Sequence, residues 1–373
     1  MNPPRHRVER TLRVGFMPLI DCAPLVAAVR LGLDRKYGLR LELRRQASWA
    51  AIRDKLIAGE LDAVHALAGL VYGVETGIGG PQDELAVLMT LNQNGQAISL
   101  SSALADGLAR GTPLRELLSG LQEPPVFAQT FPTGTHAMWL NHWLASQGVD
   151  PLGSIRSVTL PPPLMPEALA RGEIDGYCAG EPWAAGAEVA GAGRRVVRSG
   201  EIWPGHPEKV LACRREFDLQ EPDVTAALAA AVLESCRWLD APEHRREAVQ
   251  WLADRDVIDL PSARIAACLQ GDEASPPSSM LRFHDEGRVN FPWLSDGAWF
   301  LQQFRRWKLL PPGDGESDRG LVDRIHRLDT YRQAAQWAGV AVPPNATRDG
   351  PPMPSSSTMA LDDAMHKSGA SLH

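Results

Sequence analysis

Apolar and polar residues alternate along the first ninety residues in a rhythm that fits strands and helices taken in turn. Short apolar runs bounded by turn residues predict strands, and apolar residues spaced three or four apart predict helices. Strands are expected at 12–16, 39–43, 61–66 and 84–91, and helices at 23–33, 49–58 and 67–76. This alternation predicts a parallel sheet with helices on its faces.

A cluster of turn residues interrupts the alternation at Asn92-Gln93-Asn94-Gly95-Gln96. Such a cluster is typical of a crossing between two lobes. Beyond it, strands are expected at 97–100, 126–131, 155–160, 174–178 and 195–198, and helices at 136–147, at 165–171 and from Gly180 onward, where Pro182 takes a position favoured near a helix start. These elements predict a second α/β lobe.

The rest of the chain is expected to complete the first lobe. The end of segment 203–213 is predicted to be a strand that returns to that lobe, and helices are expected at 223–239, 242–255, 261–269, 295–307 and 321–338. The resulting organisation is lobe 1 from 10–96, lobe 2 from 97–205, a largely helical completion of lobe 1 from 206–342, and a disordered tail rich in Pro, Gly and Ser from 343–373. A docking segment is the alternative for this tail.

Composition narrows the classes of protein. The chain has 373 residues, of which 44% are apolar, enough for two domains or one large α/β domain. A net charge of -7 argues against a surface made for nucleic acid. The five cysteines are far apart and form no CxxC pair, so we expect neither a disulfide framework nor a zinc site, and a reducing cytoplasm fits best. We also expect no secretion signal and no transmembrane helix.

The sequence lacks the common catalytic signatures. It has no GxSxG nucleophile elbow, no P-loop, no HExxH pair, and ten scattered histidines. An enzyme is not excluded, but nothing in these residues requires one, and we expect neither catalysis nor a cofactor.

One stretch, 131–151, has the form of a binding element. A tight loop at 131–135 leads into a helix whose apolar face carries Trp139 and Trp143. Thr133 or Thr135 can cap this helix. Free amides and the positive end of the helix dipole suit a small anion, and His136 adds a donor in the first turn. A single histidine at such a place is nevertheless more often a surface residue.

Four polar residues fall where the predicted strands end or begin, which is where open α/β sheets bind ligands. They are Trp49, Gln96, His136 and Lys209. Each alone is more often a packing or surface residue. Together they offer one positive charge, an amide, an imidazole and an indole N–H, a set that suits a small anion without requiring a carboxylate or a metal ion.

Five segments in order support this interpretation: SWAAIRDKLIAGELDAVHAL, LNQNGQAISLS, FAQTFPTGTHAMWLNHWLASQGVDP, LMPEALARGEIDGYCAGEPW and IWPGHPEKVL. Over roughly residues 10–310 the chain resembles the nitrate/bicarbonate branch of the ABC-transporter solute-binding proteins. The resemblance implies a two-lobed type II periplasmic-binding-protein fold, α/β in class, with a ligand cleft between the lobes.

The resemblance also implies the ligand contacts. The nitrate binders of the family hold the anion through residues that correspond to Trp49, Gln96, His136 and Lys209. Bicarbonate binders carry an acidic residue and a calcium ion where this chain has Lys209, which favours nitrate or nitrite here. The chain departs from the family loop FPGGTHD at Thr133 and Ala137. Thr133 puts the loop geometry in doubt, because glycine permits backbone angles that threonine disfavours.

Without a recognisable signal, the chain resembles the cytoplasmic nitrate/nitrite sensors of this family (NasS type). The resemblance implies a partner, an ANTAR-domain RNA-binding antiterminator (NasT type), which is held without nitrate and released with it. We expect no direct contact with nucleic acid or membrane. The alternative is the solute-binding component of a nitrate/nitrite ABC transporter. An enzyme of the thiamin-pyrimidine-synthase kind is disfavoured, because its cysteine-rich segment is absent.

Overall fold

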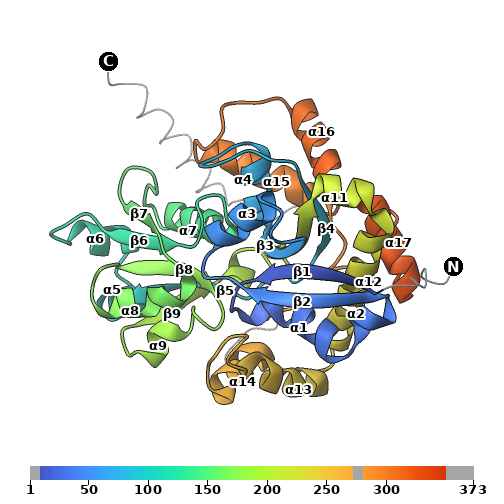
Figure 1. The fold of residues 1–373 in the computed structure, drawn as a ribbon. Coiled ribbons are helices and arrows are strands. Elements are labelled where there is room, and N and C mark those ends of the chain that lie inside the picture. Colours follow the sequence, from blue (N-terminus) through green and yellow to red (C-terminus); the bar gives the residue numbers. More distant parts are fainter. Residues whose placement is uncertain (1–8, 272–279, 350–373) are drawn as a thin grey trace. The chain divides into compact units, whose positions relative to one another are not determined.

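The computed structural model describes residues 9–271 and 280–349 and divides into two compact units (Figure 1). Unit 1 takes in residues 9–95, 133–135 and 205–349, apart from the gap, and unit 2 takes in 96–132 and 136–204. The chain therefore passes from unit 1 to unit 2 after Gly95 and returns after Pro204. Residues 133–135 also belong to unit 1, although the chain on both sides of them belongs to unit 2. The sequence did not suggest this feature.

Unit 1 is built on a five-stranded sheet in the order β2-β1-β3-β10-β4. Its strands are β1 (Arg10–Phe16), β2 (Leu39–Arg45), β3 (Ala63–Leu67), β4 (Leu85–Thr90) and β10 (Lys209–Arg214). The strand predicted near 210 does return to this sheet. It inserts antiparallel between β3 and β4, however, so the prediction of a purely parallel first sheet is wrong.

Helices cover both faces of this sheet (Figure 1). The chain runs from β1 to β2 on one side and then back across β1 to β3, so right-handed crossovers place α1 (Ala23–Arg30) and α3 (Trp49–Ile57) on opposite faces. Ser48 caps α3, and its hydroxyl accepts from Ala51 N at 3.1 Å. The other helices of unit 1 are η1 (Ile20–Cys22), α2 (Leu33–Lys36), α4 (Ala68–Glu75), α11 (Arg215–Gln220), α12 (Pro222–Trp238), α13 (Pro242–Ala253), α14 (Ser262–Gln270), α15 (Leu294–Arg306), α16 (Gly315–Ile325) and α17 (Leu328–Ala338).

Unit 2 has its own mixed sheet, ordered β7-β6-β8-β5-β9. The strands are β5 (Gln96–Ser101), β6 (Val126–Gln129), β7 (Arg156–Thr159), β8 (Gly176–Gly180) and β9 (Gly193–Arg198). β6 runs parallel to β7 and β8, while β5 runs antiparallel to β8 and β9. The carboxyl ends of β6 and β8 and the amino end of β5 therefore meet at one edge of the sheet.

The helices of unit 2 differ from the prediction in several places. They are α5 (Ser102–Ala109), α6 (Leu114–Ser119), α7 (Thr135–Ser146), η2 (Pro162–Leu164), α8 (Met165–Ala170), α9 (Gly186–Val189) and α10 (Ser199–Ile202). The sequence did not predict α5 and α6. The helix predicted from Gly180 begins only at Gly186, because turns occupy the residues between.

Residues 343–349, which we expected to belong to a disordered tail, make defined contacts in unit 1. Leu294 N donates to Ala346 O at 2.9 Å, and Arg348 N donates to Ser295 Oγ at 3.1 Å. The expectation is wrong for these seven residues, and the rest of the predicted tail, 350–373, lies outside the described residues. Within the described part of the chain, no helix combines the length and the apolar character needed to cross a membrane.

Candidate functional site

Two of the four predicted residues lie together in unit 1. Trp49 is the first residue of α3, and Lys209 is the first residue of β10, next to Leu67 at the carboxyl end of β3. Both are buried, with 1% and 0% of the residue exposed. Lys209 Nζ lies 5.6 Å from the centroid of the Trp49 ring, within the range of a cation–π contact. The tryptophan thus packs a polarisable face against a desolvated ammonium group.

The ammonium of Lys209 is held by two buried carboxylates. Its Nζ lies 2.8 Å from Asp21 Oδ2 and forms a second, shorter contact with Glu208 Oε1. Asp21 follows β1 in η1, and Glu208 directly precedes β10, with its backbone carbonyl accepting from Ala68 N. The four predicted residues did not require a carboxylate, but the structure places two beside Lys209. A buried lysine without a counter-charge is costly, so these carboxylates stabilise it.

His65 on β3 completes the cluster. Its Nδ1 accepts from Met17 N at 3.5 Å, so the neutral imidazole carries its proton on Nε2, which lies 2.9 Å from Asp21 Oδ1 and donates to it. The His65 and Trp49 rings are 5.5 Å apart between centroids. We call Asp21, Trp49, His65, Glu208 and Lys209 the polar cluster of unit 1.

The pKa values in the polar cluster follow from burial and pairing. Burial alone would raise the pKa of Asp21, but Lys209 and His65 lower it far below its usual value. Burial opposes the charge of Lys209, yet Asp21 and Glu208 raise its pKa above the usual value. Burial lowers the pKa of His65 despite Asp21. Burial also raises the pKa of Glu208 to about 7, although Lys209 acts against this. Near neutral pH, Glu208 is the member whose charge is poised to change.

The loop before α7 packs tightly against α4 within unit 1. A Cβ atom added to Gly69 would meet Thr133 O at 2.0 Å, and one added to Gly73 would meet Thr133 Oγ1 at 2.2 Å. The two glycines are four residues apart and lie on one face of α4, which makes room for Thr133. Thr135, the next unit 1 residue that bears a side chain, hydrogen bonds to Glu208 and lowers its pKa. Thr133 and Thr135 were the two proposed caps of this helix. Helix α7 begins at Thr135, so Thr135 lies within the helix and is not the cap that precedes it.

The other two predicted residues lie in unit 2. Gln96 opens β5 opposite Gly180 of β8, and its backbone exchanges hydrogen bonds with the Ser199 hydroxyl at 3.3 and 3.2 Å. His136 is the second residue of α7, and its Nδ1 shares a hydrogen bond of 2.6 Å with Thr130 Oγ1. Both residues are buried. They belong to the sheet edge at which β6 and β8 end and β5 begins.

Sequence reasoning thus found the ends of the right strands but missed part of the chemistry. The structure groups Trp49 with Lys209 in unit 1 and places Gln96 and His136 at one sheet edge of unit 2. It adds Asp21 and Glu208, which the prediction did not include. The segment HPEK could have pointed to Glu208, since it places an acidic residue directly before the lysine.

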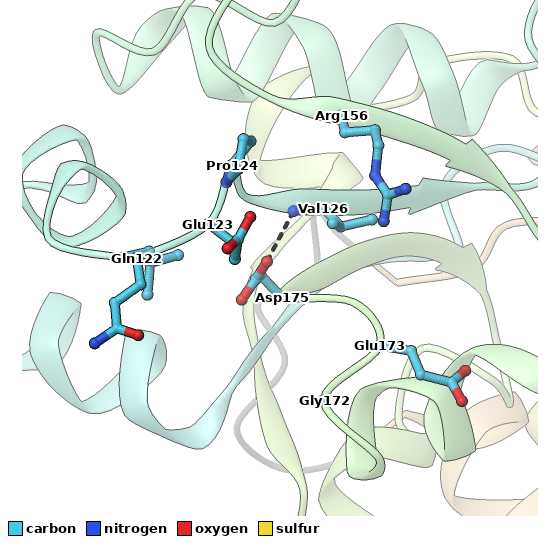
Figure 2. Close-up of a pocket in the computed structure, with 9 residues that line it drawn as sticks. Gln122, Glu123, Pro124, Val126, Arg156, Gly172, Glu173 and Asp175 are labelled. Atoms are coloured by element: carbon cyan, nitrogen blue, oxygen red, sulfur yellow. Dashed lines mark hydrogen bonds between the residues drawn. The ribbon is translucent and has the colours of Figure 1, made fainter.

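One groove of unit 2 lies elsewhere (Figure 2). This groove of about 660 Å³ lies at the amino end of β6, opposite the edge that carries Gln96 and His136. Its carboxylates already serve the fold: Asp175 accepts from Val126 N at 2.8 Å, and Glu173 pairs with Arg171 at 2.7 Å. None of the predicted residues lines it. Over the described residues, no cluster of three or more His, Cys, Asp or Glu side chains could hold a metal ion.

Each of the two α/β units carries polar residues near the ends of its sheet strands, an arrangement that fits the solute-binding proteins. The chain belongs to the NMT1-like family, whose profile matches residues 6–253, and within it to the nitrate/bicarbonate type of solute-binding proteins.

Known relatives and structures agree with this assignment. The nitrate/nitrite binding protein NrtA of Synechocystis sp. is 33% identical over 343 residues, covering 87% of this chain and 76% of the relative. The bicarbonate transport ATP-binding protein CmpC of Synechococcus elongatus is 33% identical over 356 residues, which is 93% of this chain and 52% of that longer protein.

Among solved structures, the periplasmic nitrate-binding protein NrtA from Synechocystis matches with a TM-score of 0.87 at 30% identity, covering 97% of this chain and 99% of that one. The alkanesulfonate-binding protein SsuA from Xanthomonas axonopodis matches with a TM-score of 0.61 at 17% identity, covering 87% of this chain and 99% of that one. The second likeness concerns the fold alone. The α/β periplasmic-binding-protein fold expected from the sequence is therefore confirmed.

Proposed function

We propose that this protein binds nitrate or nitrite, and that Trp49, Gln96, His136 and Lys209 contact the anion. The names of its relatives support the ligand class, since NrtA of both Synechocystis and Nostoc is a nitrate/nitrite binding protein. Bicarbonate relatives exist as well, so the ligand is a proposal rather than a property inherited from the family. The donors on the four side chains suit a small anion that can only accept hydrogen bonds.

The observation that carries the proposal is the indole of Trp49. Its Nε1 is buried and has no hydrogen-bond partner among the described residues, while its ring packs beside the Lys209 ammonium. A buried donor without a partner costs roughly 1–3 kcal/mol, so it calls for an acceptor that the described residues do not supply. A small anion next to Lys209 would accept from this N–H.

Replacing Trp49 with phenylalanine removes the donor and keeps most of the packing. Because a hydrogen bond to a charged group contributes about 1.5–3 kcal/mol, we expect nitrate affinity to fall roughly 10- to 100-fold. Isothermal titration with nitrate, nitrite and bicarbonate measures this and ranks the three ligands. Trp251→Phe is the matched control, since Trp251 stacks on Trp238, away from the polar cluster. Equal affinity of Trp49→Phe and the unaltered protein would remove Trp49 from the site.

We further propose that the protein serves as the solute-binding component of a nitrate/nitrite ABC transporter. The relatives support this role, because several are named as parts of nitrate or bicarbonate transport systems. The second candidate is the cytoplasmic sensor that holds an ANTAR-domain antiterminator until nitrate binds. The five sequence segments resemble the nitrate/bicarbonate branch as a whole, so they are compatible with this role as well as with transport. In the sensor, the anion and the partner would prefer different conformations, and linkage would then make their effects reciprocal.

A capture experiment separates the two roles. With the protein immobilised and an ANTAR-domain antiterminator in solution, the sensor role predicts a complex without nitrate and its release when nitrate is added. The Trp49→Phe variant should need 10- to 100-fold more nitrate for the same release, in step with its lower affinity. Capture that is absent, or that nitrate leaves unchanged, contradicts the sensor role and leaves transport as the proposal.

A further inference from the structure

We propose that the site takes up one proton when it binds its anion, and that Glu208 receives this proton. The inference deepens the proposed function and rests on it. It makes Glu208 a fifth residue of the site, one that admits the ligand in its neutral acid form and opposes it in its ionised form.

The geometry places two carboxylates on one ammonium. Asp21 and Glu208 both contact Lys209 Nζ, and their side chains are 3% and 0% exposed. A lysine has three N–H donors, and these two contacts use two of them, so one remains to reach a ligand. A ligand that accepts from Lys209 therefore comes close to both carboxylates, in surroundings that water does not screen.

The charges of the cluster then oppose a second anion. With Asp21 and Glu208 ionised, Lys209 charged and His65 neutral, the polar cluster carries one net negative charge. A monovalent anion would bring the total to two negative charges, which is costly in a buried site. One proton on a carboxylate restores the balance, because the cluster is then neutral before the anion enters.

Glu208 is the group that can accept this proton. Asp21 contacts both Lys209 and His65, and these two partners hold it ionised. His65 is neutral and already donates to Asp21, while burial lowers the pKa of nearby His206 to about 3. Glu208 faces Lys209 on β10 and the Thr135 hydroxyl on α7, and the negative charge of Asp21 on η1 raises its pKa. Its neutral form still accepts from Lys209 and gains an O–H that can donate.

This arrangement also selects among anions. Nitrate and nitrite carry no proton at neutral pH, so they can accept the O–H of neutral Glu208 but offer nothing to its ionised form. Bicarbonate has its own O–H and can donate to an ionised carboxylate. The protonation state of Glu208 therefore sets the preference, and nitrate is favoured over bicarbonate as the pH falls.

Isothermal titration of the whole protein with sodium nitrate tests the proposal. Binding is measured from pH 6 to pH 9 in phosphate and in Tris, whose heats of ionisation differ. Glu208 has a pKa of about 7 in the free protein, and the anion favours its protonated form. Affinity should therefore be level below about pH 6 and fall by up to tenfold per pH unit above about pH 7. The buffer dependence of the binding heat at pH 8 should correspond to uptake of close to one proton.

Glu208→Gln fixes the neutral form, so its affinity should hardly change with pH in this range and its binding heat should not depend on the buffer. Glu75→Gln is the matched control. Glu75, on α4, is also a buried glutamate with a raised pKa. It accepts a hydrogen bond from Leu85 N at 2.7 Å and takes no part in the polar cluster. This control should keep the proton uptake of the unaltered protein.

The outcomes separate this inference from the proposed function. If nitrate binds with the same affinity at pH 6 and pH 9 and no proton is taken up, the inference is overturned while nitrate binding stands. If Glu208→Gln retains the proton uptake, another group such as His136 receives the proton and the inference is again overturned. If no binding heat appears at any pH, the proposed function itself fails.

Discussion

Replacing Lys209 with methionine is expected to destabilise the protein by about 3–5 kcal/mol at pH 8, besides abolishing nitrate binding. The reason is that Asp21 and Glu208 then remain buried without their cation. Both carboxyl groups would have raised pKa values in the variant, so they would take up protons as the pH falls, and the loss of stability should shrink towards pH 5. Urea denaturation at pH 5 and pH 8 measures the difference.

A neutral version of the cluster separates stability from binding. In the triple variant with Asp21→Asn, Glu208→Gln and Lys209→Met, no buried charge is left unpaired, so most of the stability at pH 8 should return while nitrate binding stays absent. Loss of binding in a Lys209 variant alone would not distinguish a missing contact from a partly unfolded unit 1. A Lys209→Met variant as stable as the unaltered protein at pH 8 would contradict the ion cluster.

The strands of unit 1 could be predicted because their signal is local. β1, β3 and β4 are short apolar runs between turn residues, and each forms close to its predicted place. The direction of β10 could not be predicted in this way. It depends on pairing with β3 and β4, which lie far earlier in the chain, and nothing in its own apolar run encodes which strand it will join.

Errors in unit 2 have a similar cause. α5 and α6 are short helices in a segment with several turn residues, so their apolar faces are too brief to give a clear period. Pro182 was placed near a helix start because proline favours that position, but the chain continues through turns to Gly186. A residue preference describes a frequency, and the surrounding structure can override it.

The residues of the candidate site that lie near the ends of predicted strands could be predicted. Those that reach the site through contacts with residues remote in sequence could not. Trp49, Gln96, His136 and Lys209 were chosen because predicted strands end or begin near them. In the structure Gln96 and Lys209 open β5 and β10, while Trp49 and His136 lie in the first turns of α3 and α7. Asp21 was not among these candidates, because its approach to Lys209 is a contact between residues remote in sequence. Neighbouring side chains in a strand point to opposite faces, so Glu208 and Lys209 would point apart if both lay in one strand. Because β10 begins at Lys209, Glu208 lies outside the strand and this alternation does not apply to it.

Thr133 shows how a departure from a family pattern can be compensated elsewhere. The sequence suggested that threonine in this loop would disturb its geometry. The structure instead buries Thr133 against α4, where Gly69 and Gly73 leave space for its backbone and side chain. The compensating residues stand some sixty positions earlier in the chain, so they become visible as partners of the loop only when the fold is known.

The second large effect is expected at Arg348, near the end of the described chain. Its guanidinium donates through Nε and Nη2 to Asp296 at 2.9 Å each and through Nη1 to Gly205 O at 2.9 Å. Arg348→Met would leave Asp296, in the first turn of α15, buried without its cation. We expect a loss of about 3 kcal/mol at pH 8. Burial already raises the pKa of Asp296 in spite of Arg348. Without Arg348 it rises further, so the loss should diminish as the pH falls towards the usual value for aspartate.

Two controls tie this effect to the contact and to its segment. The double variant with Asp296→Asn and Arg348→Met removes the buried charge, so it should recover much of the stability lost at pH 8. Two shortened chains, one ending at Asp349 and one at Val342, differ only in residues 343–349. The second lacks Arg348 and the Ala346 carbonyl that accepts from Leu294 N, so it should be less stable than the first by at least the Arg348→Met amount. Equal denaturation midpoints for the two shortened chains would show that these residues do not hold unit 1 together.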